Sequence, residues 1–295
     1  MKFDYNRLST SESDFPFKLL SMGIFYFFIF IIEMYFQQEN SITQFKYKKT
    51  KEYPEISMWG LQNMSKVVYS CVIGNEDVVL YPFNKQPGFD YILFSDVKYE
   101  NTNWTVVLIS KEIMMSPLLK EKKENFFKIN PHLFFKNYDI SIYVDLQFRI
   151  VGNLDDFVFY AINPIDNIYI LHHQNRQNVE SEFKLAFKNP KQDSIKLLKR
   201  VHERYKKEKF PDNLGFVDST LIMRNHNSPD CIALMNKWWQ QVYKYSYRDT
   251  LSFNYAMWKT QIKIKYMATY FAYDYFNRTS INQDSSKTKK KHTDL

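Results

Sequence analysis

A carboxylate directly follows the most strand-like segment of this chain, in the stretch SIYVDLQFRIVG over residues 141–152. Ile140–Val144 is a run of β-branched and aromatic residues, a composition typical of a buried strand, and Asp145 comes next. Ligands of α/β folds bind outside the carboxyl ends of strands, where a carboxylate can hold a divalent cation that neutralises a pyrophosphate. Taken alone, Asp145 is also explained as an acidic residue that ends a strand, so its role depends on its surroundings.

Length and composition exclude several classes of protein. The chain has 295 residues, 45% of them hydrophobic and 18% aromatic, enough to fill the core of one large domain or two small ones. It has six glycines and neither glycine-rich phosphate-binding motif, which argues against a P-loop or a dinucleotide-binding fingerprint. Its two cysteines, Cys71 and Cys231, provide no disulfide framework and no metal-binding spacing.

The formal net charge of +8 is spread along the chain. Its densest pieces are Lys46–Lys51, Lys196–Lys209 and Lys287–Lys291. No zinc finger, helix-turn-helix or RNA-binding aromatic signature accompanies them, so we expect no nucleic-acid partner. A positive field also suits anionic sugar nucleotides or a membrane surface.

One apolar segment, Leu19–Phe36, has the length of a membrane span. At 1.5 Å per residue it would reach about 27 Å as a helix, and its single charge, Glu33, lies near one end. We therefore predict a single-pass type II membrane protein of the Golgi apparatus or endoplasmic reticulum with a lumenal catalytic domain. The predicted order is a cytoplasmic tail (1–18), a transmembrane signal anchor (19–36), a stem (37–65), the catalytic domain (66–278) and a disordered tail (279–295).

Strand-like and helix-like segments alternate after the stem. The predicted strands are Val67–Ile73, Phe89–Phe94, Trp104–Ser110, Ile140–Val144, Ile168–Leu171, Thr220–Met223 and Ile262–Met267. The predicted helices are Lys120–Ile129, Leu154–Ala161, Gln192–Lys207, Cys231–Tyr243 and Thr250–Lys259. This alternation indicates an α/β domain with a mixed, mainly parallel sheet flanked by helices.

Six blocks of residues occur in a characteristic order within this domain. They are VVYSCVIGNEDVVLYP (67–82), FDYILFSD (89–96), FFKINPHLFFKNYDISIYVD (126–145), HQNRQNVESE (173–182), GFVDSTLIMRNHN (215–227) and WWQQVYKYSYRDTLSFNY (238–255). In this order they resemble the glycosyltransferase-like family of plant mucilage and turgor-regulation proteins. The resemblance implies a Rossmann-like glycosyltransferase fold of the A type that uses a nucleotide-sugar donor.

The resemblance also implies a divalent cation, Mn²⁺ or Mg²⁺, on an acidic motif. The family's Asp-x-Asp corresponds here to Asp145-Leu146-Gln147, so the predicted metal ligands are Asp145 and Gln147. Gln147 offers a neutral carbonyl oxygen, which is a weaker partner than a carboxylate for a hard cation.

Other charged residues in the blocks are candidates for binding the donor. We predict that Asp96 orients the nucleoside, that Lys128 and Arg176 contact phosphate, and that Arg248 and Asp145 complete the donor site. The competing interpretation makes Asp96 a strand-end cap and leaves the cationic side chains solvated.

Asp249 and Asp218 are the predicted catalytic residues, as sugar contacts or as the base that accepts the acceptor proton. Asp249 also fits the start of a helix, where a carboxylate interacts with backbone N–H groups. Trp238 and Trp239 fall on adjacent faces of a predicted helix, which places at least one in the core and leaves the other to stack on a sugar ring.

Together these observations predict a membrane-anchored glycosyltransferase with a glycan, protein or lipid acceptor. One alternative is an inactive member of the fold that binds a sugar or a partner, which the Gln147 departure keeps open. The other is a lipid-active hydrolase, which the anchor and the basic charge favour; against it, the chain has neither a G-x-S-x-G elbow nor a zinc-type histidine cluster.

Overall fold

The computed structural model describes residues 63–74, 78, 80–161, 167–191 and 193–278. All of them belong to one compact unit, Tyr53–Leu295. The predicted transmembrane anchor (19–36), the cytoplasmic tail, most of the stem and the C-terminal tail lie outside the described residues. Within the described ranges, no helix is both long and apolar enough to cross a bilayer.

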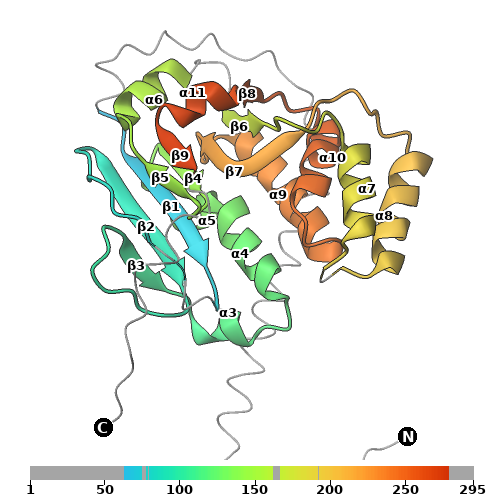
Figure 1. Ribbon diagram of the computed structural model, residues 1–295, viewed down its shortest axis with the longest axis horizontal. Helices are drawn as coiled ribbons and strands as arrows, with labels where there is room; N and C mark the ends of the chain where they lie inside the picture. Colours follow the sequence, from blue (N-terminus) through green and yellow to red (C-terminus); the bar gives the residue numbers. More distant parts are fainter. Residues whose placement is uncertain (1–62, 75–77, 79, 162–166, 192, 279–295) are drawn as a thin grey trace, which may run out of the picture. The chain divides into compact units, whose positions relative to one another are not determined.

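The described part of the chain forms a seven-stranded sheet in the order β3-β2-β1-β4-β7-β6-β8 (Figure 1). The strands are β1 (Lys66–Val72), β2 (Phe89–Ser95), β3 (Thr105–Leu108), β4 (Ile140–Val144), β6 (Ile168–His172), β7 (Val217–Arg224) and β8 (Lys265–Met267). Within this sheet β7 runs antiparallel to both of its neighbours, and all other adjacent pairs are parallel. The prediction of a mixed, mainly parallel sheet is therefore confirmed.

Helices connect the strands and cover the sheet. They are α3 (Lys111–Met115), α4 (Lys120–Ile129), α5 (Pro131–Phe134), α6 (Leu154–Ala161), α7 (Val179–Lys188), α8 (Ile195–Lys207), α9 (Pro229–Lys244), α10 (Thr250–Thr260) and α11 (Thr269–Tyr273). The predicted bounds of α4 and α6 are confirmed to the residue. A second sheet pairs β5 (Phe148–Ile150) with β9 (Phe276–Arg278) and was not predicted, nor were α3, α5, α7 and α11.

Alternation along β1 shows why the sheet needs cover on both faces. Val67 and Tyr69 pack into a core cluster with residues of α4, α9 and α10, whereas Val68 and Val72 pack into a second cluster with residues of α6, α11 and the small sheet. Because successive side chains of a strand point to opposite faces, a strand buried on both faces must be apolar throughout. The uninterrupted apolar run that predicted β1 has this origin.

Several helices begin at a side chain that caps the backbone. Asn178 accepts a hydrogen bond from the amide of Ser181 at the start of α7, and Ser194 accepts one from Leu197 at the start of α8. Such caps satisfy backbone donors that have no partner inside the helix. Helices α7, α8 and α10 then share a third core cluster, which includes Phe183, Tyr205 and Tyr255.

A buried histidine gives the fold a dependence on pH. Burial, together with the nearby Arg224 and His226, lowers the pKa of His132, in α5, from 6.5 to about 4. Between these two values the unfolded chain binds more protons at this position than the folded chain. The stability contributed by neutral His132 is thus present above pH 6.5 and is lost as the pH falls toward 4.

We predict that the free energy of unfolding falls between pH 6.5 and pH 4, with about 3 kcal/mol of the fall due to His132. Urea denaturation of the wild type and of His132→Phe at several pH values measures this contribution. The variant has no imidazole to protonate, so its curve should be flatter by that amount. Parallel curves for the two proteins would contradict the prediction.

Candidate active site

The sheet changes winding direction between β1 and β4. From β1 the chain moves to β2 on one side, and β4 later pairs with β1 on the other side, in parallel. The carboxyl ends of β1 and β4 therefore meet at a topological switch point, the usual ligand site of open α/β sheets. A cavity of about 530 Å³ lies there, and Val72, Tyr143 and Asp145 are part of its lining.

Ionisable groups dominate this cavity, which we call the switch-point cavity. Among the described residues, its lining includes the carboxylates of Glu121, Glu124, Asp145, Glu182 and Asp249 and the cationic groups of Lys128, Lys191 and Arg248. The cavity thereby brings together five of the predicted donor-binding, metal and catalytic residues: Lys128, Asp145, Gln147, Arg248 and Asp249. They come from α4, from the end of β4 and from the start of α10.

The backbone of Lys128, at the end of α4, is fixed by two core side chains. Its carbonyl oxygen accepts a hydrogen bond from the Tyr69 hydroxyl at 2.8 Å and another from the Arg224 guanidinium at 3.0 Å. Arg224 also donates to the Tyr69 oxygen. Strands β1 and β7 thus hold the end of α4 from within the core.

The ammonium group of Lys128 is fixed as firmly. Its Nζ lies 2.6 Å from Oδ2 of Asp249 and donates to Oγ of Ser219 at 2.9 Å. Burial works against the charged form, but Asp249, Asp145 and Asp218 outweigh it and raise the pKa of Lys128. A cation therefore stays in place at the floor of the switch-point cavity.

Asp145 lies beside this cation and keeps its predicted place after β4. The Tyr143 hydroxyl donates to its Oδ1 at 2.6 Å, and Nε2 of Gln147 lies 3.4 Å from its Oδ2. Burial raises the pKa of Asp145 against the opposing effects of Lys128 and the Tyr143 hydroxyl. The carboxylate is thus under-compensated for the loss of solvent, and an additional positive charge would stabilise it.

The chemistry of these donors fits the divalent cation that the sequence implies. No group of three His, Cys, Asp or Glu side chains suited to a metal exists among the described residues. Mg²⁺ commonly needs only one or two protein carboxylates, because substrate phosphates and water complete its shell. The carboxylates of the described lining also outnumber its cationic groups. Asp145 with Gln147 is accordingly the pair that would hold the ion, and Oε1 of Gln147 would have to leave the Arg278 guanidinium, from which it accepts at 3.2 Å.

Two arginines of the predicted donor site share one buried carboxylate. Glu182 forms ion pairs with Arg176 and, at 3.6 Å, with Arg248. Arg248 also lies 3.9 Å from Asp193 and donates to the carbonyl of Asn189. Arg248 lines the switch-point cavity. Arg176 does not line it, but forms an ion pair with Glu182, which does.

Asp96 and Asp218 lie outside the lining of the cavity. Both carboxylate oxygens of Asp96 accept from the Gly74 amide at 2.9 Å, so this residue ties the loop after β1 to the end of β2. Oδ1 of Asp218, in β7, accepts from the amide and the hydroxyl of Thr220. Asp218 still acts electrostatically on Lys128 and Asp145.

Asp249 combines both interpretations offered by the sequence. It is the N-cap of α10, where Oδ1 accepts from the Thr250 amide at 2.8 Å, and its Oδ2 accepts from Ser219 and pairs with Lys128. Both oxygens are therefore engaged by the protein. The carboxylate lines the cavity and caps the helix at once.

The paired tryptophans divide as expected, with one in the core. Trp238 is fully buried, donates to the Asp249 carbonyl at 2.9 Å and packs edge-on against Phe253, so its ring has no face open to a sugar. Trp238 is therefore the tryptophan of the core, and stacking on a sugar stays a prediction for Trp239 alone. Trp239 packs against Phe126 and Tyr243 and is not part of the cavity lining.

Sequence reasoning missed three carboxylates of the cavity, Glu121, Glu124 and Glu182, and two of them had a signal in the sequence. Glu124 accepts from the Ile73 amide at 3.0 Å, and burial raises its pKa. It precedes Lys128 by four residues on α4, and this spacing places both on one helix face. Glu182 ends one of the blocks that carry the family resemblance. These two signals would have identified both residues.

The ion pair between Lys128 and Asp249 should contribute strongly to stability. Their side chains are only 8% and 15% exposed. We predict that Lys128→Met or Asp249→Asn lowers the free energy of unfolding by about 3–5 kcal/mol, because each leaves its partner buried and unpaired. The double variant should lose less than the sum of the two single losses, as denaturant titration of all four proteins measures.

A matched control is the more exposed pair of Lys259 and Glu208, whose atoms approach to 2.5 Å with side chains 34% and 29% exposed. Lys259→Met should cost no more than about 1 kcal/mol. Equal losses of stability for Lys259→Met and Lys128→Met would mean that burying the pair of Lys128 and Asp249 has no energetic consequence.

Comparison with solved structures gives distant structural neighbours. No family model and no curated protein matches the chain. The apo crystal structure of mouse xyloside xylosyltransferase 1 is similar, with a TM-score of 0.37 and 14% identity over 69% of this chain and 84% of that chain. The apo structure of the bifunctional glycosyltransferase WbbM has a TM-score of 0.44 and 10% identity over 70% of this chain and 39% of that chain. At these values the likeness concerns the course of the chain and says nothing about activity.

Proposed function

We propose that this protein is a glycosyltransferase that moves a sugar from a nucleotide-sugar donor to an acceptor hydroxyl. The observation that carries the proposal is the switch-point cavity at the carboxyl ends of parallel strands, whose lining holds a fixed ammonium, Lys128, and a carboxylate suited to a metal, Asp145, that interact electrostatically. Its volume of about 530 Å³ is within the range of small-molecule sites. The order of sequence blocks that resembles a glycosyltransferase-like family supports the same assignment.

The lining residues divide the work of binding a diphosphate. Lys128 and Arg248 offer cationic groups to the phosphate oxygens. Asp145, with Gln147, would hold Mn²⁺ or Mg²⁺, and such an ion supplies positive charge that stabilises a leaving diphosphate. Asp249 keeps the Lys128 ammonium in position rather than meeting the substrate itself.

The proposal includes a place in the cell. The apolar segment Leu19–Phe36 supports a type II anchor, and with it a lumenal catalytic domain in the Golgi apparatus or endoplasmic reticulum. The proposed reaction needs an acceptor with a hydroxyl group, which a glycan, a protein or a lipid can supply.

Nucleotide binding should depend on a divalent cation, because the described lining has more carboxylates than cationic groups and repels a diphosphate on its own. Calorimetry of the full chain with UDP, GDP, ADP and CDP, with and without Mn²⁺, measures this. We expect one diphosphate to bind at least about tenfold more tightly with Mn²⁺. Asp145→Asn should abolish the Mn²⁺ effect, and Gln147→Asp should strengthen it.

A control for these variants is Asp274→Asn, which removes an exposed carboxylate between α11 and β9. It should leave both affinities unchanged. Failure of every diphosphate to bind with Mn²⁺ present would overturn the proposed function. Binding without any turnover of the matching nucleotide sugar would identify the inactive, sugar-binding member of the fold.

We assign acceptance of the acceptor proton to Asp218 in preference to Asp249, because Asp249 already uses both oxygens within the protein. Asp218→Asn should lower kcat by about 10²–10⁴-fold and leave the affinity for the nucleotide diphosphate nearly unchanged. Steady-state kinetics with the donor found by calorimetry, beside Asp274→Asn, measures this. A normal kcat for Asp218→Asn would remove the residue from the chemistry.

A further inference from the structure

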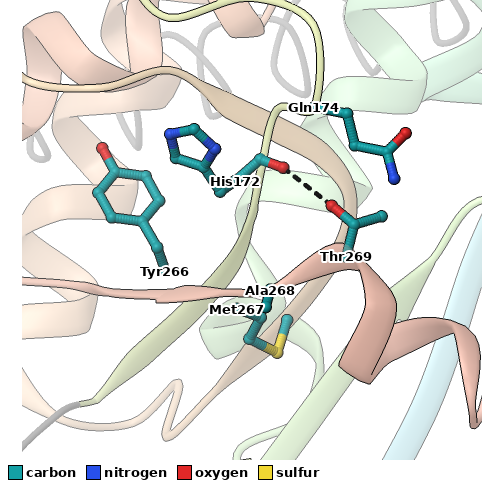
Figure 2. Close-up of a pocket in the computed structure, with 6 residues that line it drawn as sticks. All are labelled: His172, Gln174, Tyr266, Met267, Ala268 and Thr269. Atoms are coloured by element: carbon teal, nitrogen blue, oxygen red, sulfur yellow. Dashed lines mark hydrogen bonds between the residues drawn. The ribbon is translucent and has the colours of Figure 1, made fainter.

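A second cavity, of about 360 Å³, lies between the ends of β6 and β8. Figure 2 shows the six residues that line it: His172, Gln174, Tyr266, Met267, Ala268 and Thr269. The rings of His172 and Tyr266 lie edge to face, with centroids 5.4 Å apart. The Thr269 hydroxyl donates to the His172 carbonyl at 3.2 Å and ties the start of α11 to the end of β6.

The two cavities open along the same edge of the sheet. Strands β4 and β6 both pair antiparallel with β7, and β8 pairs parallel with β6. The carboxyl ends of β6 and β8 therefore point the same way as those of β1 and β4. The amino-terminal end of β7 meets them at this edge because β7 runs in the opposite direction.

The two linings differ in chemistry. The second cavity has no carboxylate, ammonium or guanidinium group among its described lining residues, whereas such groups dominate the switch-point cavity. It offers instead two rings, a thioether and the polar groups of Gln174 and Thr269. Uncharged sugars present both apolar C–H faces and hydroxyl groups, which match rings and neutral hydrogen-bonding groups.

A short piece of β7 joins the two cavities. Val217 is the register partner of His172 in the second cavity, and Ser219 contacts Lys128 and Asp249 of the switch-point cavity. Two residues of strand span about 7 Å. Asp218 lies between them in the chain; it lines neither cavity, and it acts electrostatically on Lys128 and Asp145 of the switch-point cavity.

We propose that the cavity between β6 and β8 binds an uncharged saccharide that serves as the acceptor of the transfer. This inference rests on the proposed function, because it assigns the second substrate of that reaction. The acceptor hydroxyl oxygen forms a bond to the anomeric carbon of the donor sugar. The bond from that carbon to the diphosphate oxygen breaks, the diphosphate leaves with the electron pair, and Asp218 takes the hydroxyl proton.

The test measures saccharide binding and nucleotide binding separately on the full chain. Saturation-transfer NMR with p-nitrophenyl glycosides of glucose, galactose, xylose, mannose and N-acetylglucosamine reports the first, and UDP, GDP, ADP and CDP calorimetry with Mn²⁺ reports the second. His172→Ala removes an exposed ring, and Ala268→Phe fills the cavity. Each should weaken glycoside binding about tenfold, the order of a lost aromatic contact, without changing nucleotide affinity.

Tyr270→Ala is the matched control, because Tyr270 is an 81% exposed ring on α11 that does not line the cavity. It should bind the glycosides like the wild type. His172→Ala changes an exposed side chain and should fold normally. It therefore tests the site even if Ala268→Phe destabilises the protein.

The outcomes separate the two proposals. Glycoside binding that is equal in the wild type, His172→Ala and a folded Ala268→Phe overturns the acceptor site, and so does the absence of any glycoside binding to a wild type that binds a nucleotide. Glycoside binding that needs His172, in a protein that binds no nucleotide diphosphate, supports the saccharide site and overturns the transferase function.

Discussion

Lys128 is held both at its backbone carbonyl and at its ammonium group, and the geometry of the candidate site depends on this restraint. Tyr69 and Arg224 bind its backbone carbonyl, while Asp249 and Ser219 bind its ammonium. The four partners come from β1, β7 and the cap of α10. One residue therefore links β1 and β7, the strands on either side of β4, to a helix that begins at the cavity. A fixed cation needs no reorganisation when an anionic ligand arrives, which is the condition for strong electrostatic stabilisation.

The buried carboxyl groups around Lys128 have raised pKa values, because burial disfavours their charged forms. Burial raises the pKa of Asp145, Glu124 and Glu182, although each of them has a hydrogen-bonding or cationic partner. Carboxyl groups with pKa values displaced in one direction, gathered in one cavity, are characteristic of functional sites. A fold selected for stability alone would place apolar groups at such positions, because they carry no desolvation cost. The arrangement therefore supports the proposed binding of a charged ligand in this cavity.

The sequence predicted the central strands and the longer helices because local patterns determine them. Strand β4 and helices α4 and α6 matched to the residue, since an apolar run or a helical period begins and ends sharply at each. The three-residue strands β5 and β9 were missed because such short segments show no period, and their pairing joins residues far apart in the chain.

The same distinction applies to the site. Asp145 and Lys128 were recognisable because strand ends and helix faces are local features. The contacts of Arg224 with Tyr69 and with the Lys128 carbonyl join three separate elements, and no local pattern reports them. The sequence also predicted that one of the two adjacent tryptophans is buried without revealing that it is Trp238, because that depends on packing between elements.

The reversed direction of β7 has a consequence for how such a protein can change over time. β7 enters the sheet at the edge where β1, β4, β6 and β8 leave it, and the segments that follow β6 and β8 both begin at the second cavity, which Gln174, Ala268 and Thr269 help to line. Insertions in either segment would reshape that cavity, while α4, β4 and the start of α10 would keep the switch-point cavity as it is. The two proposed substrate sites thereby rest on separate pieces of chain, so that a lineage could change one site and inherit the other.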